Sequence, residues 1–520
     1  MRGSIVQNAR PMQMMSRARR RVVTAGVMTG MLLAALEGTV VGTAMPTIVA
    51  ALGGLAHYSW VFSAYLLTST VTVPVWGKLS DIFGRRRLFQ IGVAVFLVGS
   101  AACGFAQTMT QLIIWRAVQG VGAGALVPLA MTIIGDIFTL EERAKMQGLF
   151  SGVWGVSSVF GPLVGGFITD QLSWRWVFLI NVPVGIAAAA IIGLGLVEEP
   201  RHERPRIDYL GAFVLTVTVT LLLLVLSGGG APGELVSPLN LGLLVAITGL
   251  AVWFIRIEKK AADPIVPLQL FRNRVVSVAI VVGFLAGIAM FASITFVPLM
   301  AQGVLGATAT QAGSFLTPLM LSWVLASIIG GRLLIRLGSY ALVLSGLILM
   351  FAGLVLLATF SASTPKLVLM TYLVLIGAGL GLTMLTLLIA AQHSVRREQL
   401  GITTSLNQFS RSIGGAIGVA VLGAVLAAGL AGFADDPNAL VNPEARAHIP
   451  PEDLLALQGA LERTLRMIFA ASAAVIAVAL AVALKLPRGR IEAAEVHGDP
   501  GKRFVVAEMT NIDPEHEPEA

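Results

Sequence analysis

Long uncharged, apolar runs dominate this sequence, and they restrict its fold more than any other feature. A bilayer core about 30 Å thick is crossed by roughly 20 helical residues, and fourteen runs of that length lie between charged or turn-rich breaks. They cover approximately residues 22–46, 58–77, 88–106, 110–132, 147–169, 177–197, 209–228, 239–256, 275–301, 311–331, 341–359, 367–390, 401–428 and 465–484. Lipid-spanning backbone must be helical or form a closed barrel, and these runs are too long and continuous for barrel strands. The sequence therefore predicts an all-α polytopic membrane protein.

Composition excludes the main alternatives. Charged residues make up only 12% of the 520 residues, whereas soluble domains carry roughly 25%, and a disordered chain needs low hydrophobicity. The net charge of +8 is better explained by membrane topology than by nucleic-acid binding. The chain has no G-x-x-x-x-G-K-[ST] phosphate loop, and its single cysteine, Cys103, allows no intramolecular disulfide or zinc framework. We therefore expect no enzymatic activity, no cofactor and no metal.

The basic residues predict the orientation. With the N-terminus in the cytoplasm, 29 of the 36 lysines and arginines lie on the inner side, 5 lie outside, and Arg116 and Arg411 lie within spans. This agrees with the positive-inside rule, and an even number of spans returns the C-terminus to the cytoplasm. We expect a multi-pass protein of the plasma (cytoplasmic) membrane with both termini cytoplasmic.

Three short matches in the same order predict an internal repeat. They are Thr43 to Pro46 with Thr295 to Pro298, Gly77 and Gly84 with Gly331 and Gly338, and Gly120, Gly122 and Gly124 with Gly377, Gly379 and Gly381. Their offset of 252 to 257 residues exceeds a six-helix half and leaves room for two further helices. The expected organisation is a basic cytoplasmic N-terminus (1–21), an N-terminal six-helix bundle (22–200), two inserted helices (208–257), a C-terminal six-helix bundle (275–485) with an extracellular loop (429–463), and a disordered cytoplasmic tail (486–520).

Several motifs stand at the ends or inside of the predicted spans. Gly77-Lys-Leu-Ser-Asp81-Ile-Phe-Gly84-Arg85-Arg86-Arg87 joins the second and third spans, and residues 112–124 of the fourth contain Arg116, Gln119, Gly120 and Gly124. The fifth span contains Gly161-Pro162-Leu-Val-Gly165-Gly166, and the first contains residues 36–46 with Glu37. Residues 174–183 and 408–415 form two further motifs.

Together these motifs resemble the major facilitator superfamily, and in particular its fourteen-helix drug:proton antiporter branch, over residues 20–485. Glu37 replaces the aspartate that is usual in the first-helix motif, and Ser157 replaces a central glycine of the fifth. The resemblance implies two six-helix repeats plus two inserted helices, a proton-coupling role for Arg116, and export rather than symport. The residues expected to act in gating are Gly77, Asp81, Gly84, Arg85, Arg86, Asp136, Arg143, Gly161, Pro162, Gly165 and Gly166, with Asp136 and Arg143 as an ion pair at the cytoplasmic end.

Charged residues inside spans are functional candidates, because each costs about 2.5 to 3.5 kcal/mol or more at the bilayer centre. Glu37 has no basic residue within a helical turn of it, so it is a candidate proton carrier; the alternative is a structural hydrogen bond. Arg116 either assists release of the proton from Glu37 or only holds helices together.

A polar stripe in the thirteenth span contains Asn407, Gln408 and Arg411. It either lines the substrate cavity or locks the two halves together. Met45 is expected among aromatic and methionine residues that form an adaptable apolar pocket suited to lipophilic cations.

These observations favour a proton-driven exporter (antiporter) of lipophilic, cationic compounds that works by alternating access. One alternative is an exporter of a specific endogenous lipid, siderophore or metabolite, and another is a non-transporting membrane sensor or scaffold. The expected partners are protons, a small lipophilic substrate and the lipid bilayer, without nucleic acid. The sequence leaves the oligomeric state open, and a monomer is compatible with it.

Overall fold

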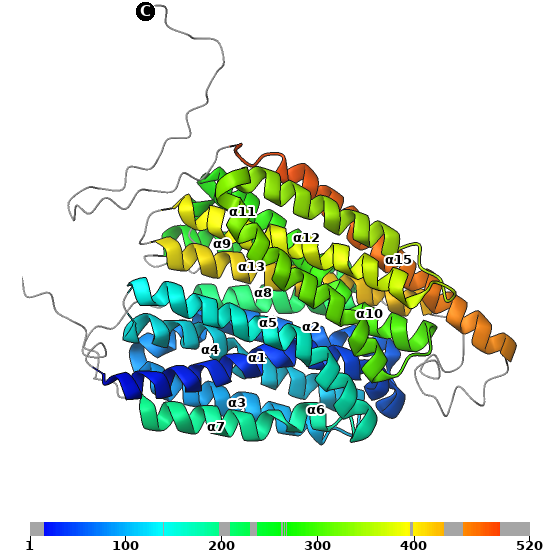
Figure 1. Ribbon diagram of the computed structural model, residues 1–520, viewed down its shortest axis with the longest axis horizontal. Helices are drawn as coiled ribbons and strands as arrows, with labels where there is room; N and C mark the ends of the chain where they lie inside the picture. Colours follow the sequence, from blue (N-terminus) through cyan, green and yellow to red (C-terminus); the bar gives the residue numbers. More distant parts are fainter. Residues whose placement is uncertain are drawn as a thin grey trace, which may run out of the picture.

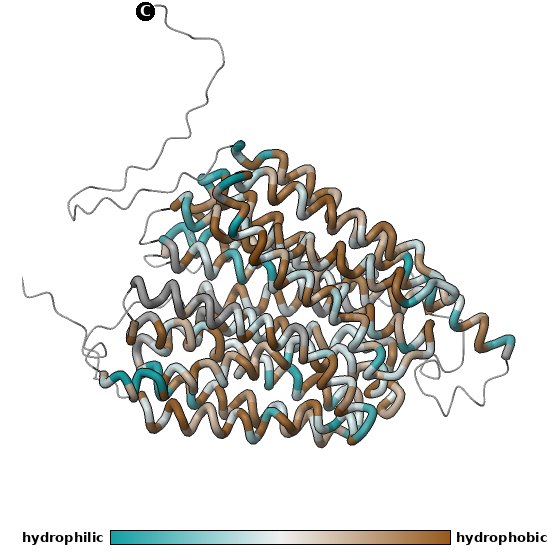
Figure 2. The backbone as a smooth tube through the Cα atoms, in the orientation of Figure 1, coloured by the Kyte–Doolittle hydropathy of each residue, from teal (hydrophilic) through white to brown (hydrophobic). Residues whose placement is uncertain are grey.

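The computed structural model describes residues 15–138, 140–196, 209–228, 237–261, 264, 266, 268–395, 399–430 and 451–488. All regular secondary structure in these residues is helical. The helices lie side by side in two groups, with α1 to α7 in one and α10 to α15 in the other (Figure 1). Hydrophobic residues cover most of the helix lengths, and hydrophilic residues gather toward the two ends of the bundle (Figure 2).

The helices of the first group, the N-terminal half, are α1 (Arg17–Leu52), α2 (Tyr58–Phe83), α3 (Arg85–Gly104), α4 (Met109–Ile137), α5 (Leu140–Gln171), α6 (Trp176–Leu179) and α7 (Asn181–Gly195), with a 3-10 turn at Leu55–His57. Within this half, α1 packs against α5 and α7, whereas α4 packs against α2 and α3. Two inserted helices follow, α8 (Tyr209–Gly228) and α9 (Pro238–Lys260). They lie at the edge of the bundle, because α8 contacts α2 and α13 while α9 contacts mainly α8.

The C-terminal half contains α10 (Arg274–Leu299), α11 (Ala309–Leu357), α12 (Lys366–His393), α13 (Leu400–Leu430) and α15 (Pro451–Ala483), with a 3-10 turn at Leu268–Arg272 and a π-turn at Met300–Val304. Here α10 packs against α13 and α15, and α11 packs against α12. Gly338 divides α11 into two segments, because its backbone leaves the helical region with φ 76°. Gly84, between α2 and α3, takes a similar φ of 89°, so the two halves turn at equivalent glycines.

The glycine rows of α4 and α12 also make equivalent contacts. Gly120 lies against the Tyr65 carbonyl of α2, and Gly122 lies against the Gly92 carbonyl of α3, with no room for a Cβ atom at either position. In the C-terminal half, Gly377 lies against the Leu319 carbonyl in the first segment of α11, and Gly379 lies against the Gly346 carbonyl in the second. These small residues allow the backbones to approach closely, which agrees with the repeat inferred from the sequence.

The structure bears on two of the sequence expectations. Twelve helices among the described residues are long and apolar enough to cross a membrane; α2 and α8 are helical but are not among the twelve, so the count of fourteen spans stays a prediction. The second expectation is the extracellular loop 429–463, which is shorter in the structure. Its residues from Pro451 onward form the beginning of α15, because Leu457, Leu461 and Leu465 recur at helical spacing and are all buried.

Candidate functional site

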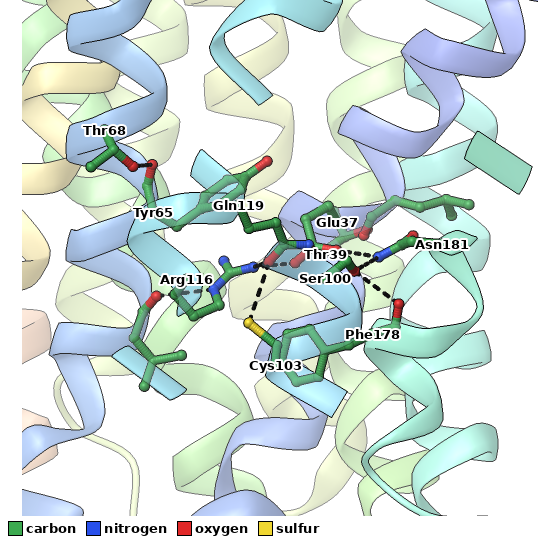
Figure 3. Close-up of polar contacts among 12 residues, drawn as sticks. Glu37, Thr39, Tyr65, Thr68, Ser100, Cys103, Arg116, Gln119, Phe178 and Asn181 are labelled. Atoms are coloured by element: carbon green, nitrogen blue, oxygen red, sulfur yellow. Dashed lines mark hydrogen bonds and ion pairs between the residues drawn. The ribbon is translucent and has the colours of Figure 1, made fainter. Parts of the chain in front are cut away.

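A buried polar cluster joins α1, α3, α4 and α7 inside the N-terminal half (Figure 3). At its centre the Arg116 guanidinium of α4 forms an ion pair with the Glu37 carboxylate of α1. The two residues are only 1% and 2% exposed, respectively. The structure therefore brings together the two charged residues that the sequence singled out, although they lie on separate helices.

The Arg116 side chain makes two further hydrogen bonds and a cation–π contact. Its Nε donates to the Val61 carbonyl of α2 at 3.2 Å, and its Nη1 donates to Gln119 Oε1 at 2.7 Å. The guanidinium also lies over the Tyr65 ring, with 4.1 Å between Cζ and the ring centroid. Arg116 and Gln119 share one face of α4 because they are three residues apart. This set of contacts fixes the guanidinium in one place and orients it toward Glu37.

The second carboxylate oxygen of Glu37 is also occupied. Asn181 Nδ2 donates to Glu37 Oε2 at 2.7 Å and to Ser100 Oγ at 3.0 Å. Ser100 of α3 in turn donates to the Phe178 carbonyl at 2.8 Å and accepts from Gln119 Nε2 at 3.0 Å. Asn181 is the first residue of α7, so the break between α6 and α7 is what places its amide beside the carboxylate.

This geometry defines what the cluster can do chemically. An ionised carboxylate with one oxygen on a guanidinium and the other on an amide is fully paired, which is the condition for keeping a charge in a low-dielectric interior. Addition of one proton would neutralise Glu37 and remove its attraction to Arg116. An ionised and a protonated form of the cluster would therefore differ by one proton and by one buried ion pair.

The glycines of the fifth-helix motif place α5 between the two halves. Gly161 lies against Thr39 of α1, and Gly165 lies against the Val40 carbonyl of the same helix. Gly166 lies on another side of α5, against Thr310 of α11, while the Pro162 carbonyl meets Gly313 of that helix. A larger side chain at these glycines would separate α5 from one of its neighbours.

The other expected gating residues lie near the ends of α2, α3, α4 and α5. Gly77 has open space where a Cβ atom would be, and Arg85 is buried while Arg86 is half-buried. The side chains of Asp81, Asp136 and Arg143 lie outside the described residues, so the proposed pair of Asp136 and Arg143 stays a prediction.

The expected cavity residues do not all share one surface. Gln408 is exposed and Arg411 is half-buried, whereas Asn407 is buried and donates to the Ala279 carbonyl of α10 at 3.4 Å. Met45 is fully buried in the apolar core and is inaccessible to a ligand in this conformation.

Sequence reasoning did not select every residue of the cluster. Asn181 and Gln119 lie inside the recognised motifs but were not assigned to the site, and an amide in an apolar run is a usable signal. Ser100 and Tyr65 carry no such signal, because a single serine or tyrosine in a membrane helix is common. Only the packing of α2 and α3 against α4 reveals that they belong to the cluster.

Comparison with known proteins places this fold in a class of membrane transporters. The family model of the Major Facilitator Superfamily matches residues 27–419. A crystal structure of a bacterial homologue of the human lysosomal transporter Spinster, in an inward-facing and occupied conformation, superposes with a TM-score of 0.65 at 16% identity, covering 90% of this chain and 97% of that one. At this identity the likeness shows the fold alone.

Sequence relatives place the chain more narrowly. The multidrug transporter protein MdtP of Bacillus subtilis is 45% identical over 410 residues, which cover 79% of this chain and 76% of that protein. Multidrug resistance protein 3 of the same organism is 35% identical over 494 residues, covering 91% and 96% of the two chains. This chain belongs to the major facilitator superfamily, and its relatives include multidrug transporters. It is a multi-pass membrane protein.

Proposed function

We propose that this protein is a proton-driven exporter (antiporter) of lipophilic compounds in the plasma membrane. The buried ion pair of Glu37 and Arg116 carries the proposal, because it provides one titratable carboxylate whose charge is balanced inside the protein. The names of the multidrug relatives support export of small compounds. The positive charge of the substrates, expected from the sequence, stays a prediction.

Contacts between the halves support alternating access. At the end of the bundle where α5 ends and α11 begins, Tyr58 Oη donates to the Thr295 carbonyl at 2.7 Å, and Gln302 Nε2 donates to the Thr43 carbonyl at 2.9 Å. With the orientation predicted from the basic residues, these contacts close the outer end of the bundle. We propose that the opposite end is the one that opens to accept substrate from the cytoplasm.

In the proposed cycle, the proton and the conformation are linked through Glu37. A proton taken up by Glu37 from the outside would be carried inward during the return to the conformation seen here, in which pairing of the carboxylate with Arg116 and Asn181 favours release of that proton. Deprotonation toward the cytoplasm would restore the ion pair. The glycines and the proline of the fifth-helix motif (Gly161, Pro162, Gly165 and Gly166) are proposed to guide this movement, since α5 contacts both halves.

The test is dye transport by purified protein in liposomes with an imposed pH gradient. We expect Glu37→Gln to abolish gradient-driven transport while the protein remains folded, because the amide cannot exchange the proton. Glu452→Gln makes the same change at an exposed position in the first turn of α15 and should transport normally. Ethidium and rhodamine B are both assayed, and an uncoupler should abolish transport by the unaltered protein. Normal gradient-driven transport by Glu37→Gln would refute Glu37 as the proton carrier.

A further inference from the structure

A second charged residue lies within a membrane helix, and the buried cluster does not use it. Arg411 is in the middle part of α13, and Thr404, Gln408 and Arg411 share one helix face at spacings of four and three residues. Ile413 and Ala416 occupy another face, where they pack with Leu67 of α2 and Val219 of α8.

The direction of the polar face follows from these contacts. The face with Ile413 and Ala416 meets α2 and α8, whereas the Arg411 backbone lies against Gly287 of α10, so the face with Arg411 is turned away from α8 and toward helices of the C-terminal half. Thr404 confirms this direction, because its hydroxyl accepts from Gln392 Nε2 of α12 at 2.8 Å. Gln408 is exposed on this face and Arg411 is half-buried. The side chains of Gln408 and Arg411 are therefore not sealed by packing within the described residues.

Arg411 lacks the charge compensation that Arg116 has. It donates to the side chain of Gln408, and within the described part of the chain no carboxylate lies within ion-pair distance of it. A guanidinium has five N–H donors in a planar fork. A cation in a membrane segment ordinarily pairs with an acid or marks the path of a substrate, and here the acid is missing from the described residues.

We propose that Arg411 and Gln408 bind an anionic group, a carboxylate or phosphate, on an amphiphilic substrate. A planar guanidinium matches such a group with two parallel hydrogen bonds. One turn further along α13, Gly415 packs tightly against the Phe291 ring of α10. That ring is only half-buried, so its exposed part is an apolar neighbour for the lipophilic body of the same molecule. This inference rests on the proposed export function and specifies its substrate class.

An anion site at Arg411 and a preference for cationic substrates predict opposite results when binding of a charged ligand is measured. A cationic site needs a free carboxylate or an aromatic cage, but both oxygens of Glu37 are already bound by Arg116 and Asn181. Arg411 would repel a cation. A pair of ligands that differ only in one carboxylate therefore separates the two predictions.

Rhodamine B and its ethyl ester form such a pair, because the ester has the same ring system without the negative charge. Equilibrium binding is measured by fluorescence polarisation with the full chain in phosphatidylcholine nanodiscs, without any gradient. The unaltered protein should bind rhodamine B more tightly than the ester. Arg411→Gln should weaken rhodamine B binding by about tenfold or more, the effect of losing a charge-assisted hydrogen bond. The same substitution should leave binding of the cationic ester unchanged or make it tighter, because it removes a repelling charge.

Two control variants separate recognition from folding. Arg411→Lys keeps the positive charge but loses the planar guanidinium that makes two parallel hydrogen bonds. It should therefore retain only part of the preference for rhodamine B over its ester. Arg466→Gln makes the same change as Arg411→Gln at an exposed position of α15 and should change neither affinity. An equal loss of affinity for both dyes in Arg411→Gln, or unchanged binding of rhodamine B, would overturn the inference.

The phosphate of a lipid headgroup could also bind at Arg411. A second binding experiment distinguishes a bound lipid from a transported substrate. If an anionic lipid occupies Arg411, phosphatidylglycerol in the nanodisc will weaken rhodamine B binding to the unaltered protein but not to Arg411→Gln, and this would overturn the assignment to a transported substrate. Because binding needs no gradient, selective binding of rhodamine B without gradient-driven transport of either rhodamine B or ethidium in liposomes would refute the proposed function and leave the anion site intact.

Discussion

At the residue scale, the buried cluster depends on one amide as much as on its two charges. Asn181 holds Glu37 Oε2 and Ser100 Oγ at the same time, so the carboxylate is fixed between Arg116 and an uncharged donor. The usual first-helix acid of the resembling family is shorter than glutamate by one methylene. The extra reach of Glu37 here ends on Arg116 and Asn181, which explains how the replacement is accommodated.

We expect Asn181→Ala to destabilise the protein by about 1–3 kcal/mol, because it leaves buried polar atoms of Glu37 and Ser100 without a partner. The melting temperature of the purified protein in detergent should fall. Asn181→Asp should retain the shape of the side chain but add a second acid beside Glu37, and one proton would then be held by the pair. A melting temperature unchanged in both variants would show that the amide contributes nothing.

At the element scale, glycine rows determine how closely α4 and α12 approach their neighbours. Gly122 lies against the Gly92 carbonyl and the Phe96 backbone of α3, whereas Gly249 on the peripheral helix α9 has nothing within 4 Å of an added Cβ atom. The same substitution should therefore have opposite consequences in the two helices.

We expect Gly122→Ala to lower the melting temperature, because overpacking of this kind costs about 1–3 kcal/mol. Gly249→Ala should be neutral or stabilising, since alanine favours the helix by about 1 kcal/mol relative to glycine. Thermal unfolding of both variants in the same detergent checks the comparison. Equal melting temperatures would mean that α3 and α4 are not packed as described.

At the scale of the whole molecule, the two halves are joined through α5 and α11. The Asp170 carboxylate near the end of α5 accepts hydrogen bonds from the backbone N–H groups of Ala309 and Thr310, at 3.2 and 2.8 Å, and from the Thr310 hydroxyl at 2.5 Å. A carboxylate at a helix N-terminus is favourably placed relative to the helix dipole. This contact ties one half to the first turn of α11 in the other.

We expect Asp170→Ala to shift the population toward a conformation open at this end. Spin labels at Phe105→Cys and Leu367→Cys, which are 68% and 78% exposed and lie in different halves, report the separation by pulsed electron paramagnetic resonance. The single native cysteine, Cys103, is buried and should label poorly. Longer distances are expected in Asp170→Ala than in the labelled parent; an identical distribution would exclude Asp170 as a latch.

Much of the helical architecture and some of the buried cluster could be predicted from the sequence. Each of the fourteen apolar ranges lies mainly within helices of the described residues, and the glycine repeats mark equivalent turns and contacts in the two halves. Glu37 and Arg116 could be selected individually, because a charge within an apolar run is visible from sequence. Their pairing could not, since 79 residues separate them and nothing local specifies which helices are neighbours.

What the sequence by itself determined was the helical, membrane-spanning class, the repeat, the family resemblance and the charged candidates. These follow from local composition, because the bilayer requires long apolar helices and penalises every unpaired charge. Only the tertiary structure decided that Asn181 and Ser100 complete the Glu37 cluster and that Met45 is buried. It also decided that α15 begins at Pro451 and that Arg411 has no acidic partner among the described residues. Those features depend on which helix faces meet, and side-chain partners contributed by distant segments are settled by packing rather than by local sequence.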